Sequence, residues 1–255
     1  MPIPAELLDS FSPISLAEMD SIRLMDRIDT KFLFHDYYLD EVLGQLQESY
    51  RVLEVNGKRI SRYESLYYDT EDFALFHLHR RGKANRFKVR NRLYVESDVC
   101  YFELKHKSNK GRTSKNRILR THPEDAIGPE AEAFLQSKSH LVPAELHPKF
   151  LVHYSRITLV NKTAAERVTI DLGLRYEGKS KQESIAHAVI AEVKQDHAFI
   201  SPFLQLMKKN HFRQASISKY CLGVISLHEE VRHNNFKPAL ITLKKILHDI
   251  PASAF

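Results

Sequence analysis

The segment from Asn85 to Lys107 constrains the fold most, because it alternates basic and apolar side chains over two consecutive stretches. In the first stretch every second position is basic, at Arg86, Lys88, Arg90 and Arg92. The positions between them are mostly apolar, at Phe87, Val89 and Leu93. The second stretch alternates between two sets, Phe102 and Leu104 against Glu103, Lys105 and Lys107. Side chains two apart in a strand share a face, so the segment predicts a β-hairpin with one apolar and one cationic face.

Such a cationic face is costly when nothing compensates its charge. Neighbouring charges lie about 7 Å apart and repel by on the order of 2 kcal/mol per pair at an effective dielectric of about 20. In open water the repulsion falls several-fold, so one strand of this kind is typical of a solvated sheet surface. Other predicted strands repeat the pattern, however. This repetition favours a surface that binds a multiply charged anion.

The rest of the chain alternates between strand and helix patterns. Six further strands are predicted, over 27–34, 50–55, 65–70, 150–160, 166–176 and 186–195. Helices are predicted over 15–25, 36–48, 71–79, 123–139, 201–210, 218–228 and 238–249. Asn56-Gly57 indicates a type I′ turn, and hence a second hairpin between the strand at 50–55 and the strand that follows it. Residues 107–120 lack apolar periodicity and are expected to form a loop, which is either solvated or contacts phosphates through Lys115 or Arg117.

Eight strands with one charged and one apolar face have two possible arrangements. The charged face can point to water, or the sheet can close with the charges inside and helices covering its outer face. The repeated basic clusters favour the second arrangement. We therefore expect an α+β protein, with a closed eight-stranded antiparallel β-tunnel and helices packed on the outside. A single domain is expected over 1–255, with a core at about 20–225 and a C-terminal helix at about 238–249.

Composition and the absence of certain motifs indicate what kind of ligand the chain binds and how. The chain has 255 residues, a formal charge of +6 and an isoelectric point near 9.1, which favours an anionic partner. It has neither a Gly-x-x-x-x-Gly-Lys loop nor a dinucleotide-binding glycine motif, so phosphates would be held by side chains. Nucleic acid is not expected as a partner, because the aromatic residues alternate with charge as core residues do.

The remaining features suggest where the chain works. Cys100 and Cys221 lie in apolar surroundings without metal-binding or disulfide spacing and are expected to be buried free thiols. No run of residues approaches membrane-spanning length, and the N-terminus lacks a leader pattern. We therefore expect a soluble, cytoplasmic protein.

Several short motifs resemble, in order, those of the VTC domain. They are Arg27-x-Asp29-x-Lys31, Ser65-Leu-Tyr-Tyr-Asp-Thr70, Lys88-x-Arg90-x-Arg92, Glu103-x-Lys105, Tyr154-x-Arg156, Arg167-Val-Thr-Ile-Asp171, Glu192-x-Lys194 and Ser218-Lys219-Tyr220. The VTC domain is the polyphosphate polymerase branch of the triphosphate tunnel metalloenzymes, which are relatives of the CYTH proteins. The resemblance covers about residues 20–225 and implies an eight-stranded antiparallel tunnel. It also implies transfer of the ATP γ-phosphoryl group onto inorganic polyphosphate, with Mn²⁺ or Mg²⁺.

The resemblance also assigns expected roles to individual residues. The expected catalytic residues are Lys31, Arg90, Arg92, Arg156 and Lys219. Further phosphate-binding residues are expected at Arg86, Lys88, Lys105, Lys115, Arg117, Arg167 and Ser218. Glu192 matches the metal-binding glutamate of the family.

Two departures from the pattern keep alternatives open. Hydrolytic relatives begin with Glu-x-Glu-x-Lys, whereas this chain has Arg27-x-Asp29-x-Lys31 and so lacks one metal carboxylate. The membrane helices and regulatory domain of the eukaryotic polymerase are also not expected here. ATP with polyphosphate or triphosphate is the expected ligand set. The alternatives are a metal-dependent inorganic triphosphatase or nucleoside triphosphatase, and a non-catalytic polyanion-binding module.

Overall fold

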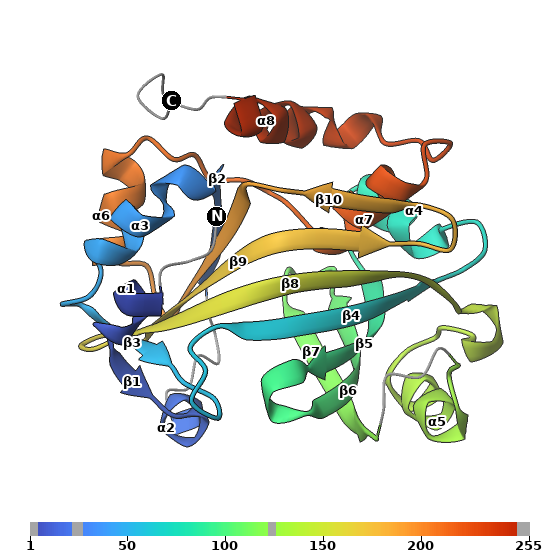
Figure 1. The fold of residues 1–255 in the computed structure, drawn as a ribbon. Coiled ribbons are helices and arrows are strands. Elements are labelled where there is room, and N and C mark those ends of the chain that lie inside the picture. The colour runs from blue at the N-terminus through green and yellow to red at the C-terminus, as the bar shows by residue number, and fades with distance from the viewer. Residues whose placement is uncertain (1–4, 22–27, 122–125, 249–255) are drawn as a thin grey trace.

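A large, mostly antiparallel sheet of 11 strands organises the fold (Figure 1). The computed structural model describes residues 5–21, 28–121 and 126–248. The strands are β1 (Ser12–Ile14), β2 (Ile28–His35), β3 (Tyr50–Leu53), β4 (Ser61–Asp69), β5 (Arg86–Tyr94), β6 (Val99–Lys107), β7 (Thr113–Arg120), β8 (His147–Asn161), β9 (Glu166–Glu177), β10 (Gln182–Ile185) and β11 (Ala188–Gln195). The α-helices are α1 (Ala5–Asp9), α2 (Leu16–Ser21), α3 (Leu39–Gly44), α4 (Ala74–Arg80), α5 (Pro129–Lys138), α6 (Pro202–Lys209), α7 (Lys219–Leu227) and α8 (Lys237–His248).

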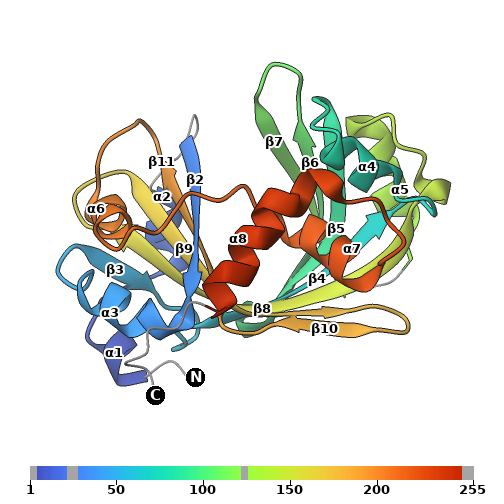
Figure 2. The same ribbon diagram turned by 90° about the horizontal axis from the view of Figure 1, so that it is seen from above.

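Eight of the strands follow one continuous path, in the order β2-β11-β9-β8-β4-β5-β6-β7. Seen from above, this path curves, with β2, β11 and β9 on one side and β5, β6 and β7 on the other (Figure 2). Within the described ranges β2 and β7 are the two ends of the path and do not pair with each other. The expected tunnel is therefore corrected in two respects: the α+β class and the antiparallel sheet are present, but the sheet is not closed, and it contains β1, β7 and β10, which were not among the expected strands.

The expected loop at 107–120 is also wrong, because most of it forms β7. This strand pairs with β6 along its whole length, from Cys100 opposite Arg120 to Lys107 opposite Thr113. Every residue of β7 is exposed or half-buried, so it has no apolar face to produce a period-two pattern. The backbone hydrogen bonds to β6, which the hydrophobic pattern cannot reveal, hold the strand in place.

The Asn-Gly turn forms as expected, but the hairpin around it does not. Asn56 and Gly57 have φ values of 49° and 72°, as a type I′ turn requires, and Val55 bridges to Lys58. Beyond this bridge the two strands separate. β3 pairs with β1 and with the C-terminal end of β8, at 159–161. β4 pairs with β5 and with the preceding part of β8, at 147–156.

Three apolar clusters hold helices against the sheet. On the outer face, α3 and α6 cover β2, β8, β9 and β11, and α5 covers β4, β5 and β6. The third cluster lies on the inner, concave face, where Tyr220 and Cys221 of α7 pack with Tyr67 and Tyr154. The expectation that the helices pack outside is therefore correct for α3, α5 and α6 but wrong for α7. As expected, both cysteines are buried free thiols.

The position of α7 depends on Gly223, which gives a first prediction. A Cβ atom there would lie 2.3 Å from a ring carbon of Phe150 and 2.8 Å from one of Tyr176. We expect Gly223→Ala to lower the free energy of unfolding by about 1–3 kcal/mol, because the overpacked helix must move off the sheet. Urea unfolding measures the change. Gly44→Ala is the matched control, since nothing lies within 4 Å of that position, and it should be neutral or slightly stabilising. Equal stabilities for the two variants would contradict the packing described here.

Candidate phosphate-binding site

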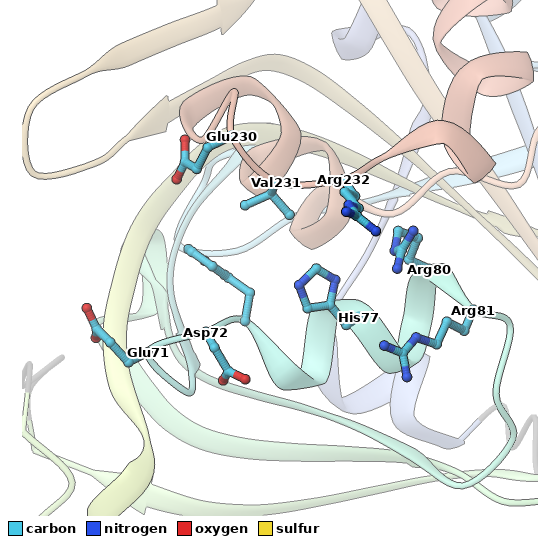
Figure 3. Close-up of a pocket in the computed structure, with 9 residues that line it drawn as sticks. Glu71, Asp72, His77, Arg80, Arg81, Glu230, Val231 and Arg232 are labelled. Carbon is cyan, nitrogen blue, oxygen red and sulfur yellow. The ribbon is translucent and has the colours of Figure 1, made fainter.

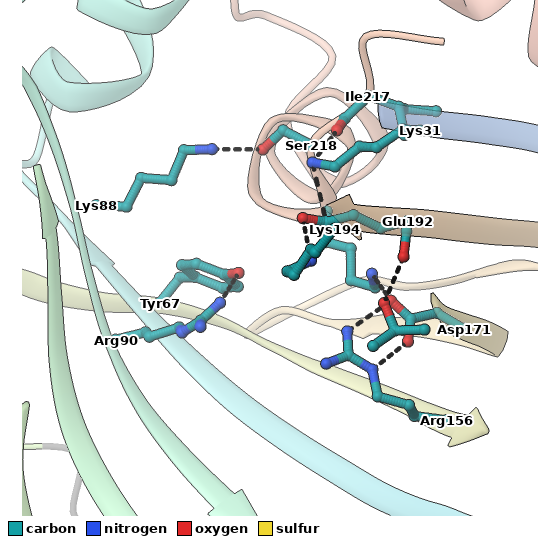
Figure 4. A network of polar contacts seen from close by, with 12 residues as sticks. Lys31, Tyr67, Lys88, Arg90, Arg156, Asp171, Glu192, Lys194, Ile217 and Ser218 are labelled. Atoms are coloured by element: carbon teal, nitrogen blue, oxygen red, sulfur yellow. Dashed lines mark hydrogen bonds and ion pairs between the residues drawn. The ribbon is translucent and has the colours of Figure 1, made fainter. Parts of the chain in front are cut away.

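Strand register gathers the expected site residues on the concave face of the sheet, which we call the basic face. Lys31 of β2 lies opposite Glu192 of β11, and Arg156 of β8 lies opposite Asp171 of β9. On the other wall, Arg90 lies opposite Glu103, and Lys88 lies opposite Lys105. Directly opposite residues point to the same face of a sheet. Residues far apart in the chain therefore surround one volume, as the close-up of Lys31, Lys88, Arg90 and Arg156 shows (Figure 4).

Each of three carboxylates on the basic face, two of them buried and one half-buried, is held by two cations. Glu103 accepts a hydrogen bond from Nε of Arg90 at 2.7 Å and forms an ion pair with Lys115. Asp171 accepts from Nε and Nη2 of Arg156 at 2.5 and 2.9 Å, and also from Nζ of Lys219.

The third carboxylate belongs to Glu192. It lies 3.8 Å from Nζ of Lys31 and forms a closer ion pair with Lys194 (Figure 4). Lys194 is part of a sequence motif but was given no role there, and the structure adds it to the site. The same unit, one carboxylate between two cations, therefore occurs three times on the basic face.

The cations set the ionisation of these acids. Burial alone would raise the pKa of the Glu103 carboxyl, but Arg90, Arg92 and Lys115 hold it well below its usual range. For the Asp171 carboxyl, Arg156 and Lys219 outweigh burial in the same way and lower its pKa. All three acids, Glu192 included, therefore remain ionised at neutral pH.

The pKa values of several lysines are lowered as well, which for an amine disfavours the charged form. Burial lowers the pKa of Lys88 to about 8 and that of Lys194 to about 8. Burial also lowers the pKa of Lys105, with a further contribution from the charge of Lys31. Burial on the basic face thus makes the charged form of these lysines less favourable. The negative charge of a bound polyanion would favour the charged form again.

Tyrosine rings form a wall behind the cations, which sequence reasoning missed by treating these residues as core alone. The guanidinium carbon of Arg156 lies 4.9 Å from the ring centre of Tyr63, and Nζ of Lys219 lies 4.7 Å from that of Tyr154. The hydroxyl of Tyr67 accepts a hydrogen bond from Arg90 at 3.0 Å. The spacing in the sequence could have revealed this wall. Tyr63 and Tyr67 are an even number of residues apart in one strand and therefore share a face.

The remaining expected residues lie around this centre. Arg92 is buried and donates to Oγ of Ser65 at 3.1 Å. Arg86 donates to the carbonyl of Lys83, and Arg117 stacks 4.1 Å over the ring of Tyr101. Arg117 and Lys115 share a face, but their contacts differ, because Lys115 forms an ion pair with Glu103.

Two further expected residues complete the set. Arg167 lies opposite Lys194 in the register. Ser218 caps α7 and also accepts from Nζ of Lys88 at 2.9 Å. Of the Arg27-x-Asp29-x-Lys31 motif, Arg27 lies outside the described residues.

The carboxylates near Glu192 suit a metal ion only if substrate phosphates supply further oxygen donors. Asp29 is opposite Lys194 and so diagonal to Glu192 on the same face, which gives two carboxylates from the protein. Among the described residues, no group of three potential metal-binding side chains includes Glu192. Mg²⁺ and similar hard ions are often held by one or two carboxylates together with substrate phosphates. Glu192 and Asp29 fit this mode, provided that Glu192 exchanges a lysine partner for the ion.

Two histidines, His77 and His153, lie away from the basic face. His77 lines a pocket of about 460 Å³ between α4 and the segment after α7, together with Arg80, Arg81 and Arg232 (Figure 3). None of the residues lining this pocket belongs to the basic face. His153 lies between Glu64 and Glu177, at 3.6 and 3.5 Å. The pocket is therefore a separate feature of the molecule.

Taken together, the fold and site define a protein whose antiparallel sheet presents a densely cationic, tyrosine-backed face suited to a chain of phosphates. A sequence model of the VTC domain matches residues 26–228, which is most of the chain. The chain belongs to the VTC domain family, as the motifs indicated. None of the curated proteins matches it.

Solved structures resemble the chain at low identity. A putative adenylate cyclase from Vibrio parahaemolyticus is 12% identical, with a TM-score of 0.46 over 76% of this chain and 97% of that one. A putative adenylate cyclase from Bacillus halodurans is 15% identical, with a TM-score of 0.47 over 76% and 96%. A putative adenylyl cyclase from Hippeastrum, described as having a dominant triphosphatase activity, is 14% identical, with a TM-score of 0.47 over 81% and 100%. At this level of similarity we base the family assignment on the domain match alone.

No helix within the described ranges is long and apolar enough to cross a bilayer.

The clamp around Asp171 gives a second prediction. Asp171 is 1% exposed, so Asp171→Asn would leave the half-buried Arg156 and Lys219 without the carboxylate that both contact. We expect the free energy of unfolding to fall by about 3 kcal/mol, and tripolyphosphate to raise the melting temperature of the variant more than that of the unmodified protein. Glu183→Gln, in an exposed pair with Lys181, should change stability by about 0.5 kcal/mol or less. An unaltered stability for Asp171→Asn would show that the clamp is not a structural ion pair.

A third prediction concerns pH. Because the free protein loses protons from Lys88 and Lys194 near pH 8, its affinity for tripolyphosphate should fall as the pH rises from about 7 to about 9. Lys88→Arg keeps its charge over this range and should flatten part of the decline. Calorimetric titration measures the affinities, and Lys181→Arg is the exposed control. Affinity that does not change with pH in the unmodified protein would contradict the low pKa values of these lysines.

Proposed function

We propose that this protein is a polyphosphate polymerase that transfers the γ-phosphoryl group of ATP onto an inorganic polyphosphate chain lying along the basic face. The observation that carries the proposal is the state of the three clamped carboxylates. Glu103, Asp171 and Glu192 are each neutralised by two cations, and each has a lowered pKa. None of them has the raised pKa of a general base for water.

This arrangement favours a nucleophile that is already charged. The terminal phosphate of a polyphosphate chain is an anion near neutral pH and needs positioning more than deprotonation. Water, by contrast, needs a base or a metal to activate it. A face with more cations than acids can hold both the ATP phosphates and the incoming chain, which together carry a large negative charge.

The residues of the chain would then act by alignment and electrostatics. Charge spreads over the equatorial oxygens of a transferring phosphoryl group, so fixed cations around it lower the barrier. Arg90 and Arg156 are held by carboxylates and present planar donors that suit phosphate oxygens. Lys31 and Lys219, on β2 and at the start of α7, supply point charges from two further elements.

Glu192, with Asp29 nearby, would hold a divalent ion, which would supply positive charge against the phosphates. Mn²⁺ and Mg²⁺ both suit an oxygen donor set of this kind. Such a site also explains how Glu192 can matter to catalysis while it rests against lysines in the ligand-free protein.

Hydrolysis of triphosphate on the same face is the second candidate. It is favoured by the tight clustering of the site, which could hold a short phosphate chain as readily as a long one. A binding module without catalysis is the third, because the basic face alone would suffice for polyanion affinity.

A fourth prediction separates these functions. Incubation of the protein with ATP and Mn²⁺ should yield ADP and polyphosphate that is resolved as a ladder on a gel. Arg156→Ala and Lys219→Ala should each slow synthesis by about 100-fold or more, because each removes a charge from the transferring group. Lys181→Ala, at an exposed lysine off the basic face, should retain full activity.

The other outcomes are distinct. Release of orthophosphate without polymer would contradict the polymerase and support the second candidate, hydrolysis. Tight polyphosphate binding that weakens steeply with salt, without turnover and without change in Glu192→Gln, would leave only the binding module.

A further inference from the structure

Three potential metal ligands meet where β2 ends, at a place with no part in the proposed reaction. His35 is the last residue of β2, Asp36 follows it, and His187 lies in the turn between β10 and β11. The backbone N–H of Asp36 donates to the carbonyl of His187 at 2.8 Å, which joins the two segments. His187 has a φ of 65°, so its backbone is held in a conformation that is uncommon for a residue other than glycine.

The ligand atoms of these residues lie close together. Nδ1 of His35 is 3.1 Å from Oδ1 of Asp36, and Nδ1 of His187 is 3.3 Å from the same oxygen. Ligands held about 2.0–2.1 Å from a tetrahedral ion are separated from one another by about 3.3 Å. Two of the three separations therefore already match those around such an ion.

The third separation, between the two imidazoles, requires a small movement. Their rings are parallel, with centres 5.2 Å apart and an angle of 3° between the planes. All three ligand atoms lie within 4.8 Å of one another. The His187 side chain is 56% exposed, so its ring can turn towards a shared ion, and water can reach the remaining coordination position.

The two ring nitrogens of His35 differ in their contacts: Nδ1 faces both Asp36 and the N–H of Tyr37, so an ion at Nδ1 would take the place of the Tyr37 hydrogen bond. The residue is 5% exposed, and its Nδ1 lies 3.0 Å from the backbone N–H of Tyr37 as well as close to Asp36. If Nδ1 accepts from Tyr37, two lone pairs face each other between Nδ1 and Asp36. If it instead carries a proton for Asp36, the Tyr37 N–H loses its acceptor. In both cases Nε2 is buried with no partner in the described part of the chain.

We propose that His35, Asp36 and His187 form a binding site for a transition metal of the Zn²⁺ class, separate from any ion at Glu192. Two imidazoles and one carboxylate suit Zn²⁺, Co²⁺ or Ni²⁺ better than Mg²⁺, which prefers oxygen ligands alone. The two sites are distinct in place, because His35 lies four residues beyond Lys31, or about 13 Å along an extended strand.

The ion would act as a clamp on the end of β2. This strand lies at one end of the strand path, where β11 is its one partner among the described strands and a single bridge joins Phe32 to Gln214. A metal that joins the end of β2 to the turn before β11 fixes both strands at the same point. Lys31 and Glu192 are carried by these two strands, so the clamp would steady one wall of the basic face.

The experiment is a calorimetric titration of the full chain, stripped with EDTA, with Zn²⁺ in the presence of excess Mg²⁺. We expect one equivalent to bind, and Co²⁺ in its place to give the visible absorption of a tetrahedral site. His187→Gly removes a ligand but suits the positive φ, and we expect it to weaken binding at least 10–100-fold. Asp36→Asn should have a similar effect.

His211→Gly is the matched control, because His211 is also exposed and has a φ of 54°. It should bind Zn²⁺ as the unmodified protein does, and so should Glu192→Gln. The proposal would be overturned if His187→Gly bound as tightly as His211→Gly, or if Glu192→Gln lost the ion. A weak, multi-site titration that neither variant changes would identify adventitious histidines and would also overturn it.

Discussion

Charge compensation on the basic face is the constraint on which the rest of this structure depends. A sheet cannot bury a row of arginines and lysines unless anions lie between them, because an unpaired buried charge is prohibitively costly. Glu103, Asp171 and Glu192 supply these anions at spaced positions, and each one joins two cations. The sheet can then curve its charged side inward, and helix α7 can place Lys219 against Asp171 from the concave side. The fold and the site are in this sense a single solution to one electrostatic problem.

The compensation is incomplete, because some lysines of the basic face have no carboxylate partner of their own among the described residues. Lys88 is satisfied by a hydroxyl rather than a carboxylate, and Lys105 lies directly opposite it on the next strand. Burial lowers the pKa of both amines, so the ligand-free protein stores unfavourable charge at the place where phosphates would bind. Sites built for function commonly sacrifice stability in this way. The tyrosine wall limits that sacrifice, because ring faces stabilise the cations without neutralising them.

Much of this could be predicted from the sequence, and the exceptions have physical causes. The alternation in Arg86–Tyr94 fixed both the strand and its cationic face, because a period of two with one apolar side admits few other interpretations. β7 escaped notice because an edge strand with two polar faces has no such period. Closure of the sheet could not be judged, since the pairing of its first and last strands is a long-range property. The place of α7 was missed because Tyr220 and Cys221 look equally suited to either face of a sheet. At the candidate site, parity identified the cations, but their partners depended on strand register.

The unclosed sheet also bears on how the protein avoids sticking to itself. A sheet with two ends leaves rows of backbone donors and acceptors that could recruit another copy of the chain, and long apolar edges are prone to aggregate. β7 is one of these ends, and it presents Lys115, Arg117 and Arg120 along a strand with no buried residue. Like charges on two such edges repel each other before their backbones can pair. The polarity that conceals β7 from pattern analysis therefore also disfavours edge-to-edge association.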